Sequence, residues 1–271
     1  MKSIITAAGK GTRLLPITRS YPKELISFCG VPVIEYGIKL LKESLITDII
    51  VVICQEKKSI IDYLGNGSLF NTNISYAIQE YPKGLGDAIL RAEHFMDNDF
   101  VLLLGDTIII DHTDLNEMIK MHEKHNAIAT ILIETVENPE RFGVVKMKEN
   151  RVISMYEKPT EKKIKDEFKI TDKSGNKGWY SIAGLYIFDV SIFSYLKKTS
   201  PGKNGEIQLT DAIKLSIDNY DIVLGHILKG KRIDIGTWEY LRDEQKFYKD
   251  LTNEELDAII MARNDIAIFK N

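Results

Sequence analysis

The sequence predicts an α/β fold with a Rossmann-like, mostly parallel sheet flanked by helices. Short runs rich in β-branched residues recur through the first half and indicate strands at 3–7, 49–53, 74–78, 100–104 and 127–134. Between most of them apolar residues recur at helical spacing, as at Val33, Ile34, Ile38 and Leu41. Strands that alternate with helices imply crossover connections and parallel pairing.

The second half predicts a smaller mixed β lobe. Residues 143–147 and 151–155 flank Lys148-Glu149-Asn150 as the two strands of a hairpin would. Further strands are expected at 180–189 and 222–228. Residues 160–178 carry many charges and few apolar side chains, which is typical of an exposed excursion. Residues 238–271 have helical spacing and predict a helical C-terminal tail, for which oligomerisation is one role.

Composition excludes several classes of protein. The chain has 271 residues, with 36 Lys and Arg against 39 Asp and Glu, so no basic footprint for nucleic acid or anionic membrane is expected. Two cysteines, Cys29 and Cys54, cannot build a disulfide framework, which favours a reducing compartment. Met1-Lys2-Ser3 leads directly into a predicted strand, so no signal peptide is expected. We therefore expect a cytoplasmic protein.

A glycine-rich turn, residues 7–13, follows the first predicted strand. Ligands of open parallel sheets bind beyond the carboxyl ends of the strands, where this turn would lie. The turn lacks the third glycine of a dinucleotide fingerprint, since Leu14 stands there, and it is not a P-loop. This pattern is compatible both with an ordinary tight turn and with a phosphate-binding loop. Arg13 and Lys23 favour the second, because a triphosphate needs fixed cations.

Residues 7–16, followed by Pro22-Lys23-Glu24-Leu25, resemble the signature of the sugar-1-phosphate nucleotidyltransferases. The resemblance implies that Arg13 and Lys23 bind the phosphates as catalytic cations. It assigns the wrapping of the nucleotide to four residues of the turn, Ala8, Gly9, Gly11 and Thr12. Ile26-Ser27 stands where the family usually has Leu-Pro, a departure that concerns loop packing more than chemistry.

The segment 79–88 joins a predicted strand to a helix, and taken alone it indicates a turn with Asp87 near the helix start. The resemblance implies more, with Gln79 and Gly84 contacting the base and ribose. Asp106 and Asp234 each follow or end a predicted strand, and two carboxylates suit a nucleotide-bound Mg²⁺. Each is typical of a turn residue by itself, whereas the resemblance makes both metal ligands.

Glu157-Lys158-Pro159 follows the second hairpin strand and by itself is typical of an exposed charged turn. The resemblance implies that Glu157 binds the hexose and that Lys158 orients its phosphate. It also places Gly143 and Gly184 in the lining of the sugar pocket. Glu206 stands in the most uridylyltransferase-like stretch, residues 201–213, and either sugar binding or helix capping suits it.

The resemblance implies one nucleotidyltransferase domain over 1–237, with a nucleotide half to about residue 135 and a sugar-phosphate half from about 136. It implies uridylyl transfer from UTP to glucose 1-phosphate with Mg²⁺, in a homo-oligomer that binds neither nucleic acid nor membrane. Thymidylyl transfer from dTTP is an alternative, because one methyl group separates the bases. A non-catalytic regulatory subunit and a dinucleotide oxidoreductase are weaker alternatives. No hexapeptide repeat follows residue 237, so we expect relatives without a β-helix domain.

Overall fold

The computed structural model describes residues 1–110, 112–160, 164, 166–171, 177–202, 205–236, 238 and 257. The chain divides into two compact units. The first contains residues 1–82, 103–113 and the part from 230 onward, and the second contains 83–102 and 114–229. The sequence predicted two halves that meet near residue 135, each named for the substrate it would bind. The two units above are defined by contacts within the chain instead, so the predicted halves stay a prediction.

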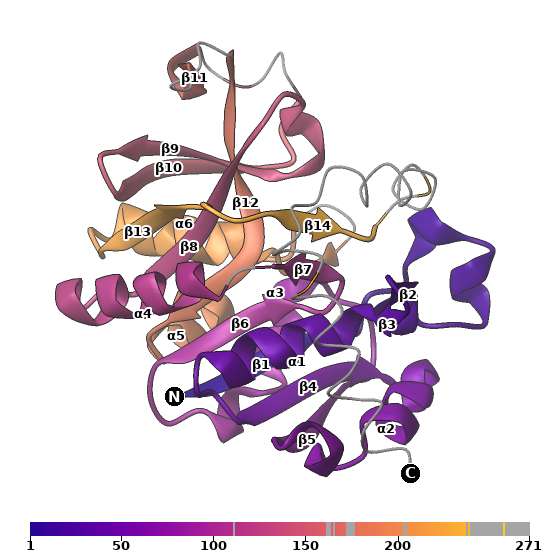
Figure 1. Cartoon of the computed structure of the whole chain (residues 1–271). Helices are drawn as coiled ribbons and strands as arrows, with labels where there is room; N and C mark the ends of the chain where they lie inside the picture. The colour runs from indigo at the N-terminus through magenta and orange to yellow at the C-terminus, as the bar shows by residue number, and fades with distance from the viewer. Residues whose placement is uncertain are drawn as a thin grey trace. The chain divides into compact units, whose positions relative to one another are not determined.

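A parallel sheet forms the centre of the first unit (Figure 1). Strand β4 (Asp48–Cys54) lies between β1 (Lys2–Thr6) and β5 (Asn73–Gln79), and both pairings are parallel as predicted. Five consecutive residues of β4 are buried, because a central parallel strand has both faces covered. Helix α1 (Val33–Glu43) packs on the sheet at Gly37, where a Cβ would lie 2.7 Å from Leu103 Cδ2. Helix α2 spans Lys58–Leu64.

The carboxyl ends of these strands carry the irregular segments that hold the predicted nucleotide residues. Between β1 and α1 the chain forms three short 3₁₀ turns, η1 (Thr12–Leu14), η2 (Ile17–Arg19) and η3 (Lys23–Leu25). The segment after β1 forms no long helix, and Pro16, which disfavours one, lies within it. The small hairpin of β2 (Ser27–Phe28) and β3 (Val31–Pro32) completes the connection to α1.

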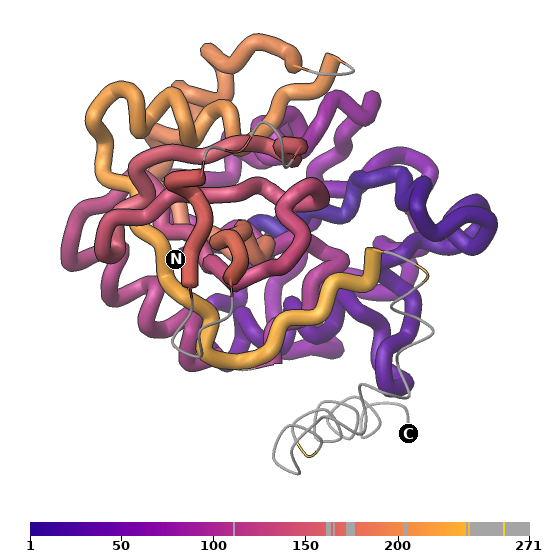
Figure 2. The backbone as a smooth tube through the Cα atoms, turned by 90° about the horizontal axis from the view of Figure 1, so that it is seen from above, coloured from indigo at the N-terminus to yellow at the C-terminus, as the bar shows by residue number. Residues whose placement is uncertain are grey.

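A second small antiparallel pair brings distant parts of the first unit together. Strand β7 (Thr107–Ile109) pairs with β14 (Arg232–Asp234), which follows it by more than a hundred residues. Leu14 of η1 shares a buried apolar cluster with Ile108, Ile233 and Ile235. In Figure 2 the yellow segment that carries β14 runs to the indigo segment around residues 10–20. This cluster therefore fixes the glycine-rich turn beside β7 and β14.

The second unit mixes parallel and antiparallel strands, as expected of the sugar half. Strand β8 (Ala129–Val136) pairs antiparallel with β12 (Lys177–Phe188) and parallel with β13 (Val223–Ile227). The predicted hairpin is confirmed as β9 (Gly143–Lys148) and β10 (Arg151–Glu157), with β10 also pairing with β13. Strand β6 (Phe100–Leu104) has residues in both units.

Helices and shorter elements complete the second unit. They are α3 (Leu85–Leu90), η6 (Glu93–Phe95), α4 (Thr113–His125), η7 (Pro139–Arg141), α5 (Ile192–Lys198) and α6 (Leu209–Asp218). No helix among the described residues is long and apolar enough to cross a membrane.

The described part of the segment 160–178, which comprises 160, 164, 166–171, 177 and 178, is mostly exposed, as its charges predicted. It contains η9 (Asp166–Phe168) and β11 (Lys169–Thr171), which pairs with β12. Phe168 is buried and packs with Trp179 and Val144 in a small apolar cluster. Ile164 belongs to the same cluster, so two apolar side chains hold the described part of this charged segment against β9 and β12. The predicted helical tail, 238–271, lies outside the described residues except at 238 and 257.

Candidate functional site

The glycine-rich turn is held in a conformation that requires glycine. Gly11 has a φ of 65°, in the left-handed region, and a Cβ there would lie 2.8 Å from Thr18 Cγ2. The Thr18 hydroxyl donates a hydrogen bond of 2.7 Å to the Gly11 carbonyl. Ala8 is buried, Gly9 and Thr12 are exposed, and a Cβ on Gly9 would lie 3.8 Å from Lys23 Nζ. The turn and Lys23 therefore border the same space.

Lys23 and Asp106 form an ion pair at the end of β6, and both side chains are largely buried. Burial alone would lower the pKa of Lys23, but the charges of Asp106 and Glu24 hold that pKa above its ordinary value. Burial alone would raise the pKa of Asp106, whereas Lys23 keeps it below the usual range. Both groups are consequently charged at neutral pH.

Asp234 ends β14 directly beside Asp106. It is paired in register with Thr107, and the Ile235 amide donates a 3.1 Å hydrogen bond to the Asp106 carbonyl. Arg232 Nη2 lies 3.3 Å from Asp234 Oδ2. Burial and the negative charge of Asp106 raise the pKa of Asp234. The two carboxylates are 128 residues apart in the sequence, yet they lie close enough for the charge of one to affect the pKa of the other.

The donor set of Asp106 and Asp234 fits a divalent cation of the Mg²⁺ class. Mg²⁺ takes one or two protein carboxylates and fills its octahedron with phosphate oxygens and water. The part of the chain that the structure describes contains no group of three or more acidic, His or Cys side chains that could enclose a metal. The pair therefore suits a metal that arrives with phosphate oxygens.

A second ion pair anchors the segment that carries Lys23. Glu24 is almost completely buried, and both of its carboxylate oxygens accept from Lys57 Nζ, at 2.8 and 2.7 Å. Lys57 belongs to η4 (Gln55–Lys57), which follows β4. Burial raises the pKa of Glu24, and the charges of Lys57 and Lys23 oppose that rise. This contact ties η3 to the carboxyl end of β4.

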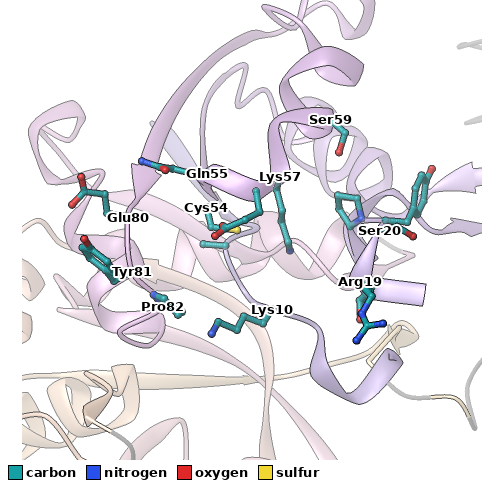
Figure 3. A pocket seen from close by; sticks show the side chains of 15 residues that line it. Lys10, Arg19, Ser20, Cys54, Gln55, Lys57, Ser59, Glu80, Tyr81 and Pro82 are labelled. Carbon is teal, nitrogen blue, oxygen red and sulfur yellow. The ribbon is translucent and has the colours of Figure 1, made fainter. Parts of the chain in front are cut away.

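A cavity of about 560 Å³ opens at the carboxyl ends of β1, β4 and β5 (Figure 3). Ala8 and Lys10 line it from the glycine-rich turn, and Tyr81 and Pro82 line it from the segment after β5. In Figure 3 the Lys10 side chain extends toward Pro82. Gln79 ends β5 and is buried, opposite Cys54 in register. The cavity thus lies between two of the segments assigned to the nucleotide.

Gly84 lies in the second unit and has a φ of 95°. A Cβ on Gly84 would lie 2.7 Å from the Ile207 carbonyl and 2.9 Å from Glu206 Cβ. The sequence predicted glycine here for close approach of a ligand, and the structure adds a packing reason. Glu206 does not cap α6, because the N-cap is Gln208, whose side chain makes no capping hydrogen bond.

The predicted sugar-phosphate residues lie together in the second unit. Glu157 pairs in register with Gly143, and its Oε2 accepts a 2.8 Å hydrogen bond from the Thr210 hydroxyl. Lys158 Nζ lies 3.1 Å from Glu157 Oε1, with its side chain 62% exposed. Lys158 has a φ of 38°, an uncommon value for a residue with a side chain. Lys158 directly follows the end of β10, whereas Glu157 is its last residue.

Gly184 is buried within β12 and has a φ of 86°, at an irregularity between Ile182 and Tyr186. A Cβ on Gly143 would lie 2.7 Å from Ile182 Cδ1 and 3.1 Å from Thr210 Cγ2. Gly143 therefore relieves crowding between Glu157 and β12, and Gly184 allows the positive φ at the irregularity of β12, the kind of position at which a strand bends.

Sequence reasoning missed three residues that support this site: Lys57, Thr210 and Arg232. Lys57 stands in a run of charged residues that indicates a solvated turn, and Arg232 stands in a similar run at 229–232. Thr210 lies in the stretch 201–213, singled out for its resemblance, but its contact with Glu157 carries no local signal. Each depends on a partner far away in the sequence.

Comparisons with known proteins place this geometry in a family. The family model described as nucleotidyl transferase matches residues 2–251. A glucose-1-phosphate thymidylyltransferase of Neisseria meningitidis is 34% identical over 257 residues, which cover 93% of this chain and 84% of that protein. A solved UDP-glucose pyrophosphorylase in complex with UDP-glucose has a TM-score of 0.79 and 29% identity, covering 92% of this chain and 99% of the other.

A longer curated relative is the bifunctional protein GlmU of Methanococcus maripaludis, 36% identical over 256 residues. These residues cover 94% of this chain and 56% of that protein, so the chain spans somewhat more than half of this relative. The expectation of relatives without a β-helix domain stays a prediction, because the match covers only the part of this relative that resembles the chain. The predicted α/β fold class is confirmed by the solved neighbours. This chain belongs to the nucleotidyl transferase family.

Proposed function

We propose that this protein is a sugar-1-phosphate nucleotidyltransferase that transfers a uridylyl group from UTP to glucose 1-phosphate. A phosphate oxygen of glucose 1-phosphate attacks the α-phosphorus of UTP, the bond from that phosphorus to the β-phosphate oxygen breaks, and pyrophosphate leaves. The products are UDP-glucose and pyrophosphate. The observation that carries the proposal is the convergence of Lys23, Asp106 and Asp234 next to the glycine-rich turn.

The reaction asks the protein for positioning and charge stabilisation. The nucleophile is already an anion, so no general base is required. Lys23 is held charged in a buried setting, where a fixed cation stabilises developing negative charge more strongly than it would in water. Arg13, exposed on η1, would bind the same phosphates. Ala8, Gly9, Gly11 and Thr12 would supply the backbone around the nucleotide.

Asp106 and Asp234 would hold Mg²⁺. The metal would supply a divalent charge that neutralises phosphate oxygens and holds them in a fixed orientation. Arg232 beside Asp234 and Lys23 beside Asp106 keep the two carboxylates oriented. Asp234 ends β14, and Asp106 directly precedes β7 and accepts a backbone hydrogen bond from Ile235, so the backbone of this strand pair holds the two acids near each other.

Glu157 and Lys158 would bind the second substrate. The Glu157 carboxylate accepts from sugar hydroxyls, and the exposed Lys158 ammonium binds and steers the attacking phosphate. Gly143, in register with Glu157, and Gly184 of β12 would line the hexose site. Thymidylyl transfer from dTTP is a second candidate, favoured by the curated thymidylyltransferase relative. Gln79 could hydrogen-bond either base, and a single methyl changes binding by only about 1–3 kcal/mol.

A grid of nucleotides against hexose 1-phosphates, read by released pyrophosphate with and without Mg²⁺, tests the proposal. We expect the highest turnover with UTP and glucose 1-phosphate, and none without a divalent metal. Higher turnover with dTTP would replace the uridylyltransferase by the second candidate. If no pair releases pyrophosphate, the remaining candidate is a non-catalytic regulatory subunit that binds nucleotide. Size-exclusion chromatography with light scattering tests the expected homo-oligomer.

Two variants test the assigned roles in the same assay. Asp106→Asn and Lys158→Ala should each lower kcat by about 100- to 1,000-fold, the usual cost of losing one transition-state contact. Lys148→Ala is the matched control, because this exposed lysine lies at the far end of the same hairpin. Near-normal turnover of either site variant would contradict its role.

A further inference from the structure

Trp238, which follows β14 in the chain, contacts the segment just after the glycine-rich turn. Its indole Nε1 donates a 3.0 Å hydrogen bond to the Leu15 carbonyl, 223 residues earlier in the chain. Leu15 lies two residues after Arg13 and directly after η1. Both side chains are partly exposed, Trp238 at 39% and Leu15 at 49%, so the contact lies at the surface of the first unit.

Two further contacts join the same pair of segments. Leu14 packs with Ile233 and Ile235 in a buried cluster. At Gly236 a Cβ would lie 3.0 Å from Arg13 Nη2 and 2.7 Å from Asp234 Oδ1. The guanidinium of Arg13 therefore rests against the backbone of the segment that carries Asp234, a close approach that glycine permits.

We propose that Trp238 is a positioning residue that holds Arg13 in place for the nucleotide phosphates. The inference rests on the proposed function and deepens it. η1 is a single 3₁₀ turn, and its N-cap, Gly11, has no side chain that could accept a capping hydrogen bond, so local structure alone restrains it weakly. Leu14 holds the buried side of the turn. The Trp238 hydrogen bond restrains the chain just beyond Arg13 on its exposed side.

The expected effect is on nucleotide binding more than on chemistry. Arg13 would contact the phosphates both before and during the reaction, and a weaker contact of that kind raises KM with little change in kcat. A neutral hydrogen bond of this type corresponds to about a 3- to 10-fold change in an equilibrium. The KM for hexose 1-phosphate should stay constant, because the residues assigned to that substrate belong to the second unit.

Trp238→Phe tests the proposal, since it keeps an aromatic ring and removes the N–H donor. We expect the KM for UTP to rise about 3- to 10-fold, with kcat and the KM for glucose 1-phosphate within twofold of the unchanged protein. Calorimetric titration with UTP and Mg²⁺ measures the same loss of affinity without turnover. Tyr220→Phe is the matched control, because Tyr220 is 92% exposed in the second unit.

The outcomes separate this inference from the proposed function. If Trp238→Phe binds UTP as tightly as the unchanged protein, Trp238 is not a positioning residue for Arg13. The same holds if the variant raises the KM for UTP and the KM for glucose 1-phosphate equally. If the unchanged protein transfers no nucleotide but Trp238→Phe still weakens UTP binding, the proposed reaction fails and the inference stands. If dTTP proves to be the substrate, the same titrations with dTTP apply.

Discussion

Replacing Lys57 by Met should destabilise the protein strongly, because it leaves the buried Glu24 carboxylate without its counter-charge. Glu24 is 1% exposed, and both of its oxygens accept from Lys57 Nζ. Removing one partner of a buried pair costs about 3–5 kcal/mol. For a protein of this size about 3 kcal/mol corresponds to a fall in Tm of roughly 6–12 °C.

The loss should depend on pH in a defined direction. Burial raises the pKa of Glu24 in the folded state, and without Lys57 that pKa rises further. Between the unfolded value, about 4.3, and the raised folded value, the folded state binds more protons than the unfolded state. Stability therefore falls as pH rises through this window, so the variant should lose less at pH 5.5 than at pH 8.

Thermal unfolding of three proteins at pH 5.5 and pH 8 provides the assay: the unchanged chain, Lys57→Met, and Lys57→Met with Glu24→Gln. The double variant carries no buried charge at this position, so it should regain much of the lost stability and show little pH dependence of its own. A fall in Tm below about 2 °C for Lys57→Met at pH 8, or an equal fall at both pH values, would refute the reasoning.

Two further predictions concern the second unit. Thr210→Val should raise the KM for glucose 1-phosphate about tenfold or more in steady-state assays, since the Thr210 hydroxyl fixes Glu157 at 2.8 Å. Thr210→Ser, which keeps the hydroxyl, should not, and equal KM values for both variants would contradict this role. Burial lowers the pKa of His122 to about 4, so stability should decline as pH falls from about 6.5 toward 4, where the unfolded chain binds the proton first. Denaturation curves at pH 7 and pH 5 measure this loss in the free energy of unfolding, and His122→Asn should reduce it by about 1–3 kcal/mol. An unchanged loss in the variant would show that other groups cause the decline.

Elements with a strong local signal could be predicted from the sequence. The strands of the parallel sheet are buried on both faces, so β4 and β6 are nearly unbroken apolar runs. Helix α1 begins at Val33 as its spacing indicated. The turn between β9 and β10 follows from the polar residues 148–150. Asp106 was correctly placed just beyond a buried strand.

Other features depend on partners that no short window of sequence contains. Strands β7 and β14 have three residues each, too few for a recognisable alternation, and they form only because the chain returns after residue 230. Lys57 and Thr210 carry no local sign of the carboxylates they bind. The burial of Ile164 and Phe168 against Val144 and Trp179 was not predicted, because the many charges around them carry the stronger local signal.

The charges around the proposed nucleotide site nearly balance before any substrate binds. Glu24, Asp106 and Asp234 face Lys57, Lys23 and Arg232, and Arg13 is exposed beside them. A triphosphate would therefore meet little excess positive charge unless a divalent cation joins the two aspartates.

We expect UTP to bind at least about tenfold more weakly when Mg²⁺ is replaced by a chelator, as measured by calorimetry at constant ionic strength. Asp234→Asn should remove most of this difference, since one carboxylate is then lost, whereas Asp97→Asn, an exposed acid of the second unit, should preserve it. Equal affinity with and without Mg²⁺ would show that the cations of the chain suffice and that the aspartates do not act as metal ligands.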